Sequence, residues 1–147
     1  MTAKELMKQC EAEEKELKFR EFSSETALAI GMALIEEAKK RDNKICIDIA
    51  IAGRRLFHYS SDGNAVSNDI MIERKKKTAM HTGHSSLWAH YMLEDCGMNI
   101  KEKWALEPSE YAQVGGAFPI RLENCQTVIG NNNMLLVLIM NRIIVLL

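Results

Sequence analysis

Residues 45–60 read Ile-Cys-Ile-Asp-Ile-Ala-Ile-Ala-Gly-Arg-Arg-Leu-Phe-His-Tyr-Ser, and this stretch decides the fold. Its first half places isoleucine at every odd position from 45 to 51, with cysteine, aspartate and alanine between them. This period of two, with β-branched side chains on one face, is typical of a half-buried strand. Gly53 and Arg54 can form a two-residue turn, after which Arg55 to Ser60 can return as a second strand. The stretch therefore predicts a β-hairpin.

Helical patterns lie on both sides of this hairpin. Residues 3–19 favour a helix with only a thin apolar stripe, so we expect it to be peripheral or to pack on a partner. A second helix can be capped by the serines at 23–24 and should end near Arg41. Residues 67–94 form a longer helical pattern that Gly83 can break or bend, which gives either one bent helix or two short ones.

A run of candidate strands follows the long helix. The candidates are residues 104–106, 118–122, 125–129 and 135–140, with a turn at Glu123 and Asn124 between the middle pair. Strands grouped on both sides of a helix, without regular β-α-β alternation, favour an antiparallel α+β domain. The sequence contains no Gly-x-Gly-x-x-Gly or Gly-Lys-Ser/Thr loop, which disfavours a doubly wound nucleotide-binding fold. We expect a single domain over residues 1–147.

Composition excludes several classes of partner. The net charge of −1 provides no global field for nucleic acid, and 47% hydrophobic with 27% charged residues is an ordinary globular balance. The four cysteines are widely spaced and the N-terminus lacks a signal-peptide pattern, so we expect reduced thiols and a cytoplasmic location. The longest apolar stretch, residues 134–147, is interrupted by Asn141 and Arg142 and is too short for a membrane span of about 20 residues.

Polar and titratable residues are concentrated between Asn68 and Ser86. On a continuous helix, Arg74, Thr78, His81 and Ser85 would share one face, because they are spaced by four, three and four. An arginine fork and a histidine on one face suit an anion such as a phosphate or a propionate. The alternative is a solvated helix face with intrahelical ion pairs.

The histidines and serines of this segment allow other chemistry. His81 and His84 are three residues apart and could present two imidazoles to a metal or a haem iron, but the spacing is common by chance and we predict no metal site. Ser85 and Ser86 follow directly, yet adjacency in sequence does not build a nucleophile and its base, so a serine hydrolase is disfavoured. We interpret His58 as an ordinary strand residue.

Residues 111–121 read Tyr-Ala-Gln-Val-Gly-Gly-Ala-Phe-Pro-Ile-Arg. Gly115 and Gly116 place two residues without Cβ where the backbone can turn sharply or approach a ligand, and turn geometry alone is the alternative. With the polar helix, this segment defines the expected ligand-binding set. The candidate site residues are Arg74, Lys75, Thr78, His81, His84, Ser85, Ser86, Tyr111, Gly115 and Gly116.

Two motifs carry a family resemblance. The polar helix has Asn68, Ile72, Arg74 and Lys75 in the pattern Asn-x-x-x-Ile-x-Arg-Lys, and residues 115–120 read Gly-Gly-Ala-Phe-Pro-Ile. With Ser-Ser at 85–86 and Pro-Ser-Glu-Tyr at 108–111, the chain resembles the GlcG-like and HbpS-like haem-degrading-domain family from about Leu17 to Gly130.

The resemblance implies a profilin-like fold, in which helices flank a five-stranded antiparallel sheet, and assembly into a homo-oligomer. Here an extra N-terminal helix would occupy residues 1–20. The resemblance also implies binding of haem or a corrin-like ligand, although no residue here matches the haem ligand or the acidic metal motif of haem-binding members. Residues 131–147 form an atypical tail, because the family pattern continues with an acidic amphipathic helix. A frameshift or a truncation would explain that change.

Three functional hypotheses follow. The leading one is an oligomeric protein that binds a small anionic ligand, with haem as a candidate cofactor and with Arg74 and Lys75 holding the anion. The second is an enzyme that acts on haem or another small cofactor through His81 or His84. The third is a non-catalytic adaptor whose charged N-terminal helix recruits a protein. All three are compatible with the same fold.

Overall fold

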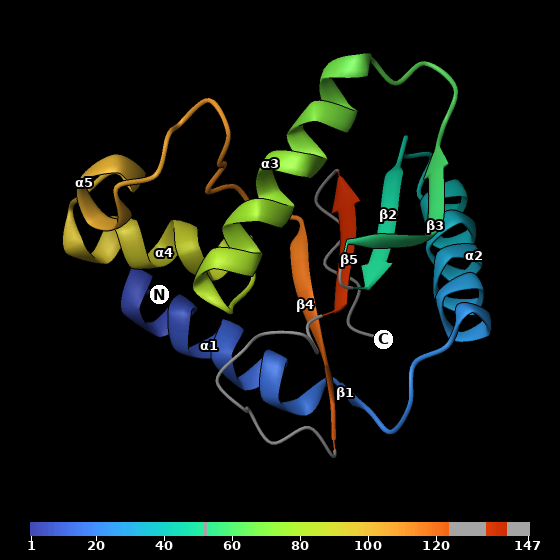
Figure 1. The fold of residues 1–147 in the computed structure, drawn as a ribbon, viewed down its shortest axis with the longest axis horizontal. Helices are drawn as coiled ribbons and strands as arrows, with labels where there is room; N and C mark the ends of the chain where they lie inside the picture. Colours follow the sequence, from blue (N-terminus) through green and yellow to red (C-terminus); the bar gives the residue numbers. More distant parts are fainter. Residues whose placement is uncertain (52, 124–134, 141–147) are drawn as a thin grey trace.

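The structure is a computed structural model that describes residues 1–51, 53–123 and 135–140, the last of these as backbone only. The helices are α1 (Ala3–Glu16), α2 (Ser24–Lys40), α3 (Val66–Thr82), α4 (Ser86–Cys96) and α5 (Ile100–Trp104). The strands are β1 (Lys18–Phe19), β2 (Cys46–Ile51), β3 (Arg54–Ser60), β4 (Ala117–Leu122) and β5 (Leu135–Met140). Figure 1 shows their arrangement.

The strands form one sheet of order β1-β4-β5-β2-β3. Strands β2 and β3 make the expected hairpin, and β5 pairs antiparallel with both β2 and β4. The α+β class is confirmed. The expectation of a wholly antiparallel sheet was wrong at one edge, where Lys18 and Phe19 run parallel to β4. The cause is local: helix α1 ends at Glu16 instead of continuing to Phe19, and the chain then follows β4, with the Glu123 amide donating to the Phe19 carbonyl.

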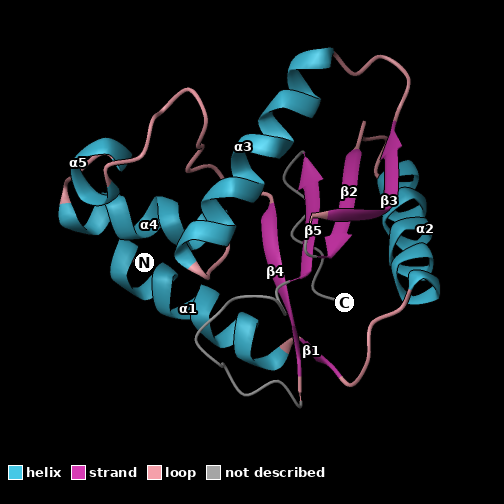
Figure 2. Ribbon diagram, viewed as in Figure 1, coloured by secondary structure: helices cyan, strands magenta, loops and turns pink. Residues whose placement is uncertain are grey.

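Helices cover both faces of the sheet (Figure 2). The odd positions of β2 pack against α2, in a core that contains Ala27, Leu34, Ile35, Ala38, Ile45, Ile47, Ile49 and Ile120. The even positions face α3, where Cys46 packs with Ile72, Ala79 and Ala117. Because β2 is central and covered on both sides, its even positions are also buried. A polar side chain at such a position needs hydrogen-bond or ion-pair partners, and Asp48 is such a side chain.

The long helical pattern is divided into α3 and α4. Gly83 adopts a left-handed conformation, with φ of 73°, and ends α3, after which Ser85 caps α4 by accepting a hydrogen bond from the Trp88 amide. Glycine suits this position because other residues are strained at positive φ. The row of Arg74, Thr78, His81 and Ser85 was expected only on a continuous helix, and this condition is not met, since Ser85 lies beyond the end of α3.

The remaining strand predictions had different outcomes. Residues 118–122 and 135–140 are confirmed as strands within β4 and β5. The strand predicted at residues 104–106 is wrong, because Trp104 ends α5, a short helix that begins with an Asn99 capping box. The strand predicted at residues 125–129 and the position of Asn124 lie outside the described residues.

Helix α1 packs against α4 and also contacts β4. Cys10 is buried with Trp88 and Ala89, and the Trp88 indole N–H donates to Glu11 at 3.0 Å. Within the described part of the chain, no helix is long and apolar enough to cross a membrane.

Candidate functional site

Lys75 is a buried cation in the middle of α3. It is only 5% exposed, and its Nζ donates to the Gly115 carbonyl at 3.0 Å. Among the described residues, no carboxylate forms an ion pair with it. Burial lowers the pKa of Lys75, because removal from water penalises the charged amine. The structure thus brings together two residues of the predicted site, Lys75 and Gly115.

The segment from residue 112 to 117 is fixed against α3 and α4. The amides of Ala112 and Ala117 donate to the Arg74 carbonyl at 3.2 Å and to the buried Ser86 hydroxyl at 2.9 Å. A Cβ on Gly115 would lie 3.2 Å from a Leu87 methyl group, so the backbone approaches α4 as closely as the diglycine pattern suggested.

Arg74 lies beside Lys75 and reaches the preceding loop. Its Nη2 donates to the Pro108 carbonyl at 2.6 Å. Its Nε is buried and has no hydrogen-bond partner in the described part of the chain. Unsatisfied buried N–H groups are rare because each one costs about 1–3 kcal/mol. Arg74 and Lys75 therefore both carry donors that the described residues leave unused.

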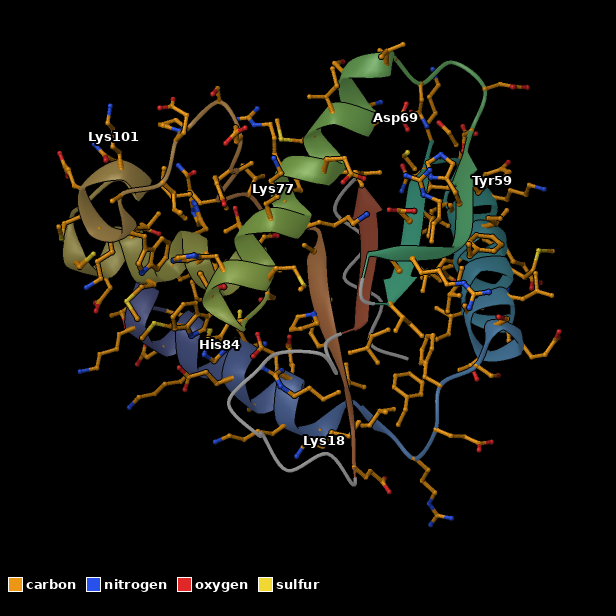
Figure 3. All side chains as sticks on the ribbon, viewed as in Figure 1. Lys18, Tyr59, Asp69, Lys77, His84 and Lys101 are labelled. Carbon is orange, nitrogen blue, oxygen red and sulfur yellow. The ribbon has the colours of Figure 1, made fainter. Side chains whose placement is uncertain are left out.

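His84, labelled in Figure 3, lies with Ser85 at the junction of α1 with the start of α4. The Glu14 carboxylate lies 2.7 Å from His84 Nδ1 and accepts from the Ser85 amide at 2.7 Å. The His84 ring stacks on Trp88, with ring centroids 4.0 Å apart. Both residues are thus engaged in fastening helices together, and the structure does not bring them to Lys75.

The other predicted residues of α3 point in different directions. Thr78 is buried and donates back to the Arg74 carbonyl at 3.2 Å. His81 is exposed, and its ring lies 6.3 Å from the rings of both Trp104 and Tyr111. Lys77 approaches the Tyr111 ring at 6.0 Å. His81 and Tyr111 therefore belong to an aromatic surface on the outer side of α3.

A second polar cluster centres on Asp48 and was missed by sequence reasoning. Asp48 is 0% exposed on β2, and its carboxylate accepts from Arg55 Nε at 2.7 Å and from Lys76 Nζ. Glu73 lies 3.6 Å from Arg55 Nη2 and 3.1 Å from Lys76 Nζ. His58 Nδ1 lies 3.6 Å from Asp48 Oδ1. The charge of the buried aspartate is thus compensated from β3 and α3.

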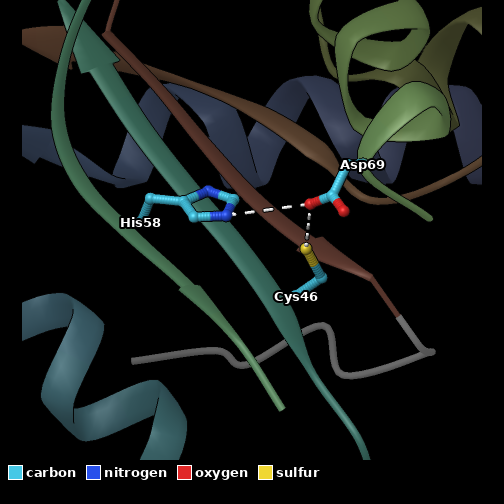
Figure 4. Close-up of side chains that lie close together, drawn as sticks. All are labelled: Cys46, His58 and Asp69. Atoms are coloured by element: carbon cyan, nitrogen blue, oxygen red, sulfur yellow. Dashed lines mark hydrogen bonds and ion pairs between the residues drawn. The ribbon is translucent and has the colours of Figure 1, made fainter. Parts of the chain in front are cut away.

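Cys46, His58 and Asp69 extend this cluster towards the start of α3 (Figure 4). The Cys46 thiol donates to Asp69 Oδ1 at 3.3 Å, and His58 Nε2 lies 3.7 Å from the same oxygen. Their three donor atoms all lie within 4.8 Å of one another. Burial, followed by the hydrogen bond to Asp69, raises the pKa of the Cys46 thiol to about 11.

A sequence signal for this cluster was present in the hairpin. Cys46 and Asp48 occupy the polar positions of an otherwise apolar strand, and the hairpin register pairs Asp48 with His58. A polar residue on a central strand needs a partner at the facing position. Asp69 could not be found in this way, because its place depends on how α3 crosses the sheet.

The family comparison matches most of the chain. The family described as "Haem degrading protein HbpS-like" matches residues 22–131. A UPF0303 protein of Edwardsiella ictaluri is 34% identical over 128 residues, which cover 87% of this chain and 82% of that protein. A UPF0303 protein of Streptomyces coelicolor is 36% identical over 110 residues, covering 75% of this chain and 70% of the relative.

A solved structure has a similar fold. The crystal structure of Ybr137w protein matches with a TM-score of 0.79 at 29% sequence identity. The match covers 90% of this chain and 75% of the other.

Proposed function

The chain belongs to the HbpS-like haem-degrading family, and we propose that it binds a small anionic ligand of the haem class where α3 meets residues 112–117. The observation that carries this proposal is the buried Lys75 amine, which has one carbonyl acceptor and no carboxylate partner among the described residues. A buried charge is costly unless it is paired. A ligand carboxylate would provide the missing counter-charge.

Arg74 supports the same proposal. Its buried Nε has no partner within the described part of the chain and lies on the residue next to Lys75. A carboxylate can accept several hydrogen bonds from arginine and lysine, and haem carries two such groups as propionates. The residues present therefore fit the carboxylates of haem, which would add a redox-active iron when bound. The diglycine at 115–116 would let the backbone move aside to admit the ligand.

The proposal includes a homo-oligomer with a profilin-like domain. Leu28 and Met32 on α2 are 46% and 55% exposed, and an apolar helix face of this kind can be covered by a second copy. The arrangement of α2 and α3 on opposite faces of the sheet supports the profilin-like description. Light scattering on the purified chain, repeated with Met32→Lys, tests the assembly, and a monomeric wild type would refute it.

Haemin titration tests the ligand proposal. We expect Lys75→Met to weaken haemin binding, measured from the Soret band, by at least about 10-fold. Its free energy of unfolding should equal that of the wild type or exceed it. Replacing a buried charge by an apolar side chain is often neutral or stabilising. Lys101→Met, at an exposed position of α5, is the matched control and should bind as the wild type does. Equal weakening in both variants, or a parallel loss of stability and binding in Lys75→Met, would refute the proposal.

A second candidate function is an enzyme that acts on haem. The observation in its favour is the exposed His81 imidazole beside Trp104 and Tyr111, a group that can ligate iron or transfer protons. His81 fits this role better than His84, which is engaged by Glu14. The assay is loss of the Soret band when the protein–haemin mixture is kept in air with ascorbate. An unchanged rate in His81→Ala would refute this candidate.

A further inference from the structure

The donor atoms of Cys46, His58 and Asp69 have the spacing of a metal site. Tetrahedral Zn²⁺ binds sulfur at about 2.3 Å and nitrogen or oxygen at about 2.0–2.1 Å, which places neighbouring ligand atoms about 3.3–3.6 Å apart. Cys46 Sγ and His58 Nε2 lie 3.3 Å and 3.7 Å from Asp69 Oδ1. The remaining sulfur-to-nitrogen distance is within 4.8 Å, so a small rotation of either side chain would complete the geometry.

We propose that Cys46, His58 and Asp69 bind a divalent transition-metal ion of the Zn²⁺ class. The three residues come from β2, β3 and α3, so the ion would connect the hairpin to the helix that covers it. A thiolate, an imidazole and a carboxylate together select a borderline-soft ion over Mg²⁺ or Ca²⁺, which prefer oxygen ligands alone. On binding, the ion replaces the thiol hydrogen that Cys46 now donates to Asp69, and this proton passes to water.

The residues behind the histidine are placed as in known metal sites. A ligating histidine almost always donates its second ring N–H to a carboxylate, a backbone carbonyl or water, which orients the ring and raises its basicity. His58 Nε2 faces Asp69, and its Nδ1 lies 3.6 Å from the buried Asp48 carboxylate. Asp48 is in turn fixed by Arg55 and Lys76. Asp48 is therefore a positioning residue for His58.

The charge of the cluster favours a cation. Asp48, Asp69 and Glu73 contribute three carboxylates, against the two permanent cations Arg55 and Lys76. One negative charge is left over before His58 is considered. A divalent ion with one new thiolate adds a single positive charge, which brings these groups to neutrality.

The burial of the three ligands defines an open side. Cys46 is 1% exposed, whereas the side chains of His58 and Asp69 are 33% and 46% exposed. The sulfur would therefore hold the ion from inside, and the fourth position would face solvent, where water can bind. Three protein ligands with one open position are typical of zinc sites that exchange ligands or catalyse reactions.

Cobalt substitution in the untagged 147-residue chain tests the site. Co²⁺ bound to a thiolate gives an intense near-ultraviolet charge-transfer band, and Zn²⁺ should displace it with a stoichiometry of one. We expect Cys46→Ser to abolish the band and Asp69→Asn to weaken Co²⁺ binding at least 10-fold. Asp69 is half exposed, so this second variant keeps the test valid if Cys46→Ser does not fold. Cys96→Ser and His90→Gln are controls at exposed positions of α4.

The charge-transfer band of Co²⁺ decides whether the three residues bind a metal. A band in the wild type that persists in both controls and is lost or weakened in the two site variants supports the site. Absence of the band in the wild type, its persistence at full strength in Cys46→Ser or Asp69→Asn, or its loss in Cys96→Ser would overturn it. These outcomes do not depend on haemin binding, because the site shares no residue with Lys75 and the diglycine.

Discussion

Removal of the Glu14 carboxylate should destabilise the protein more than any other single change on α1. Its side chain is 3% exposed and makes two contacts of 2.7 Å, with His84 Nδ1 and the Ser85 amide. Arg121 Nη1 lies 3.5 Å away, and the same guanidinium donates to the Gly83 carbonyl. One buried carboxylate thus joins α1 to the start of α4 and to β4.

The expected loss of stability follows from these contacts. Hydrogen bonds to a charged group contribute about 1.5–3 kcal/mol each, and breaking a buried ion pair costs about 3–5 kcal/mol, because the remaining charge is left unpaired. We expect Glu14→Ala to lower the free energy of unfolding by about 3–5 kcal/mol. Glu14→Gln should cost about 1–2 kcal/mol, since its amide oxygen can still accept from the Ser85 amide.

Urea unfolding, followed by tryptophan fluorescence, measures the free energy of unfolding of both variants. The protein concentration is held constant, because assembly makes apparent stability depend on concentration. Trp88 reports on this junction directly because it stacks on His84. Glu16→Ala, at an exposed position of the same helix, is the control and should change stability by less than about 0.5 kcal/mol. A loss below about 1 kcal/mol in Glu14→Ala would show that the Glu14 contacts do not hold α1 in place.

Three further predictions concern other residues. Asp48→Asn should weaken Zn²⁺ binding about 10–100-fold by releasing His58, measured by calorimetry, and unchanged affinity would contradict its positioning role. Folding lowers the pKa of Lys75 from 10.5, so the folded chain binds fewer protons at this amine than the unfolded chain, and the free energy of unfolding should rise with pH up to about 10.5. Lys75→Met should lose this rise in urea titrations from pH 7 to about 10.5. A slope retained in Lys75→Met would show that other groups cause the rise. Gly83→Ala should cost about 1 kcal/mol in thermal unfolding because φ is 73°, and a neutral result would refute the strain argument.

The parts of the fold that sequence patterns predicted are those set by local chemistry. The alternation in residues 45–51 gave the first strand of the hairpin, and Ser23 caps α2 as expected, with its hydroxyl accepting from the Thr26 amide. The patterns failed at two places, one decided by a local helix cap and one by a contact at long range. Trp104 was assigned to a candidate strand, whereas an Asn99 capping box begins a short helix that contains it. Phe19 joined a helix in the prediction but pairs with Leu122 across the sheet edge.

The candidate site was predictable only in part, for a geometric reason. Lys75 and Gly115 are 40 residues apart, and two motifs of the sequence placed both in one predicted site. The structure brings Lys75 Nζ to 3.0 Å from the Gly115 carbonyl, and ligand binding there stays a prediction. His84 was placed with them by proximity in sequence, but the break at Gly83 turns it towards α1. The Asp48 cluster was predictable only through the hairpin register, which pairs Asp48 with His58. Its other members, such as Glu73 and Lys76, come from α3, whose crossing of the sheet no local pattern gives.

The two proposed sites share α3, and their relation can be tested. Asp69 and Lys75 are six residues apart, about 9 Å along a helix. The metal would hold α3 to the hairpin, whereas the ligand proposed at Lys75 would displace residues 112–117 and would leave α3 in place. We therefore expect no coupling: saturating Zn²⁺ should change the haemin dissociation constant less than about 2-fold, measured by fluorescence titration with Asp69→Asn as the metal-free control. Because linkage is reciprocal, haemin should leave Zn²⁺ affinity equally unchanged. A shift of 10-fold or more, absent in Asp69→Asn, would mean that α3 itself moves when the ligand enters.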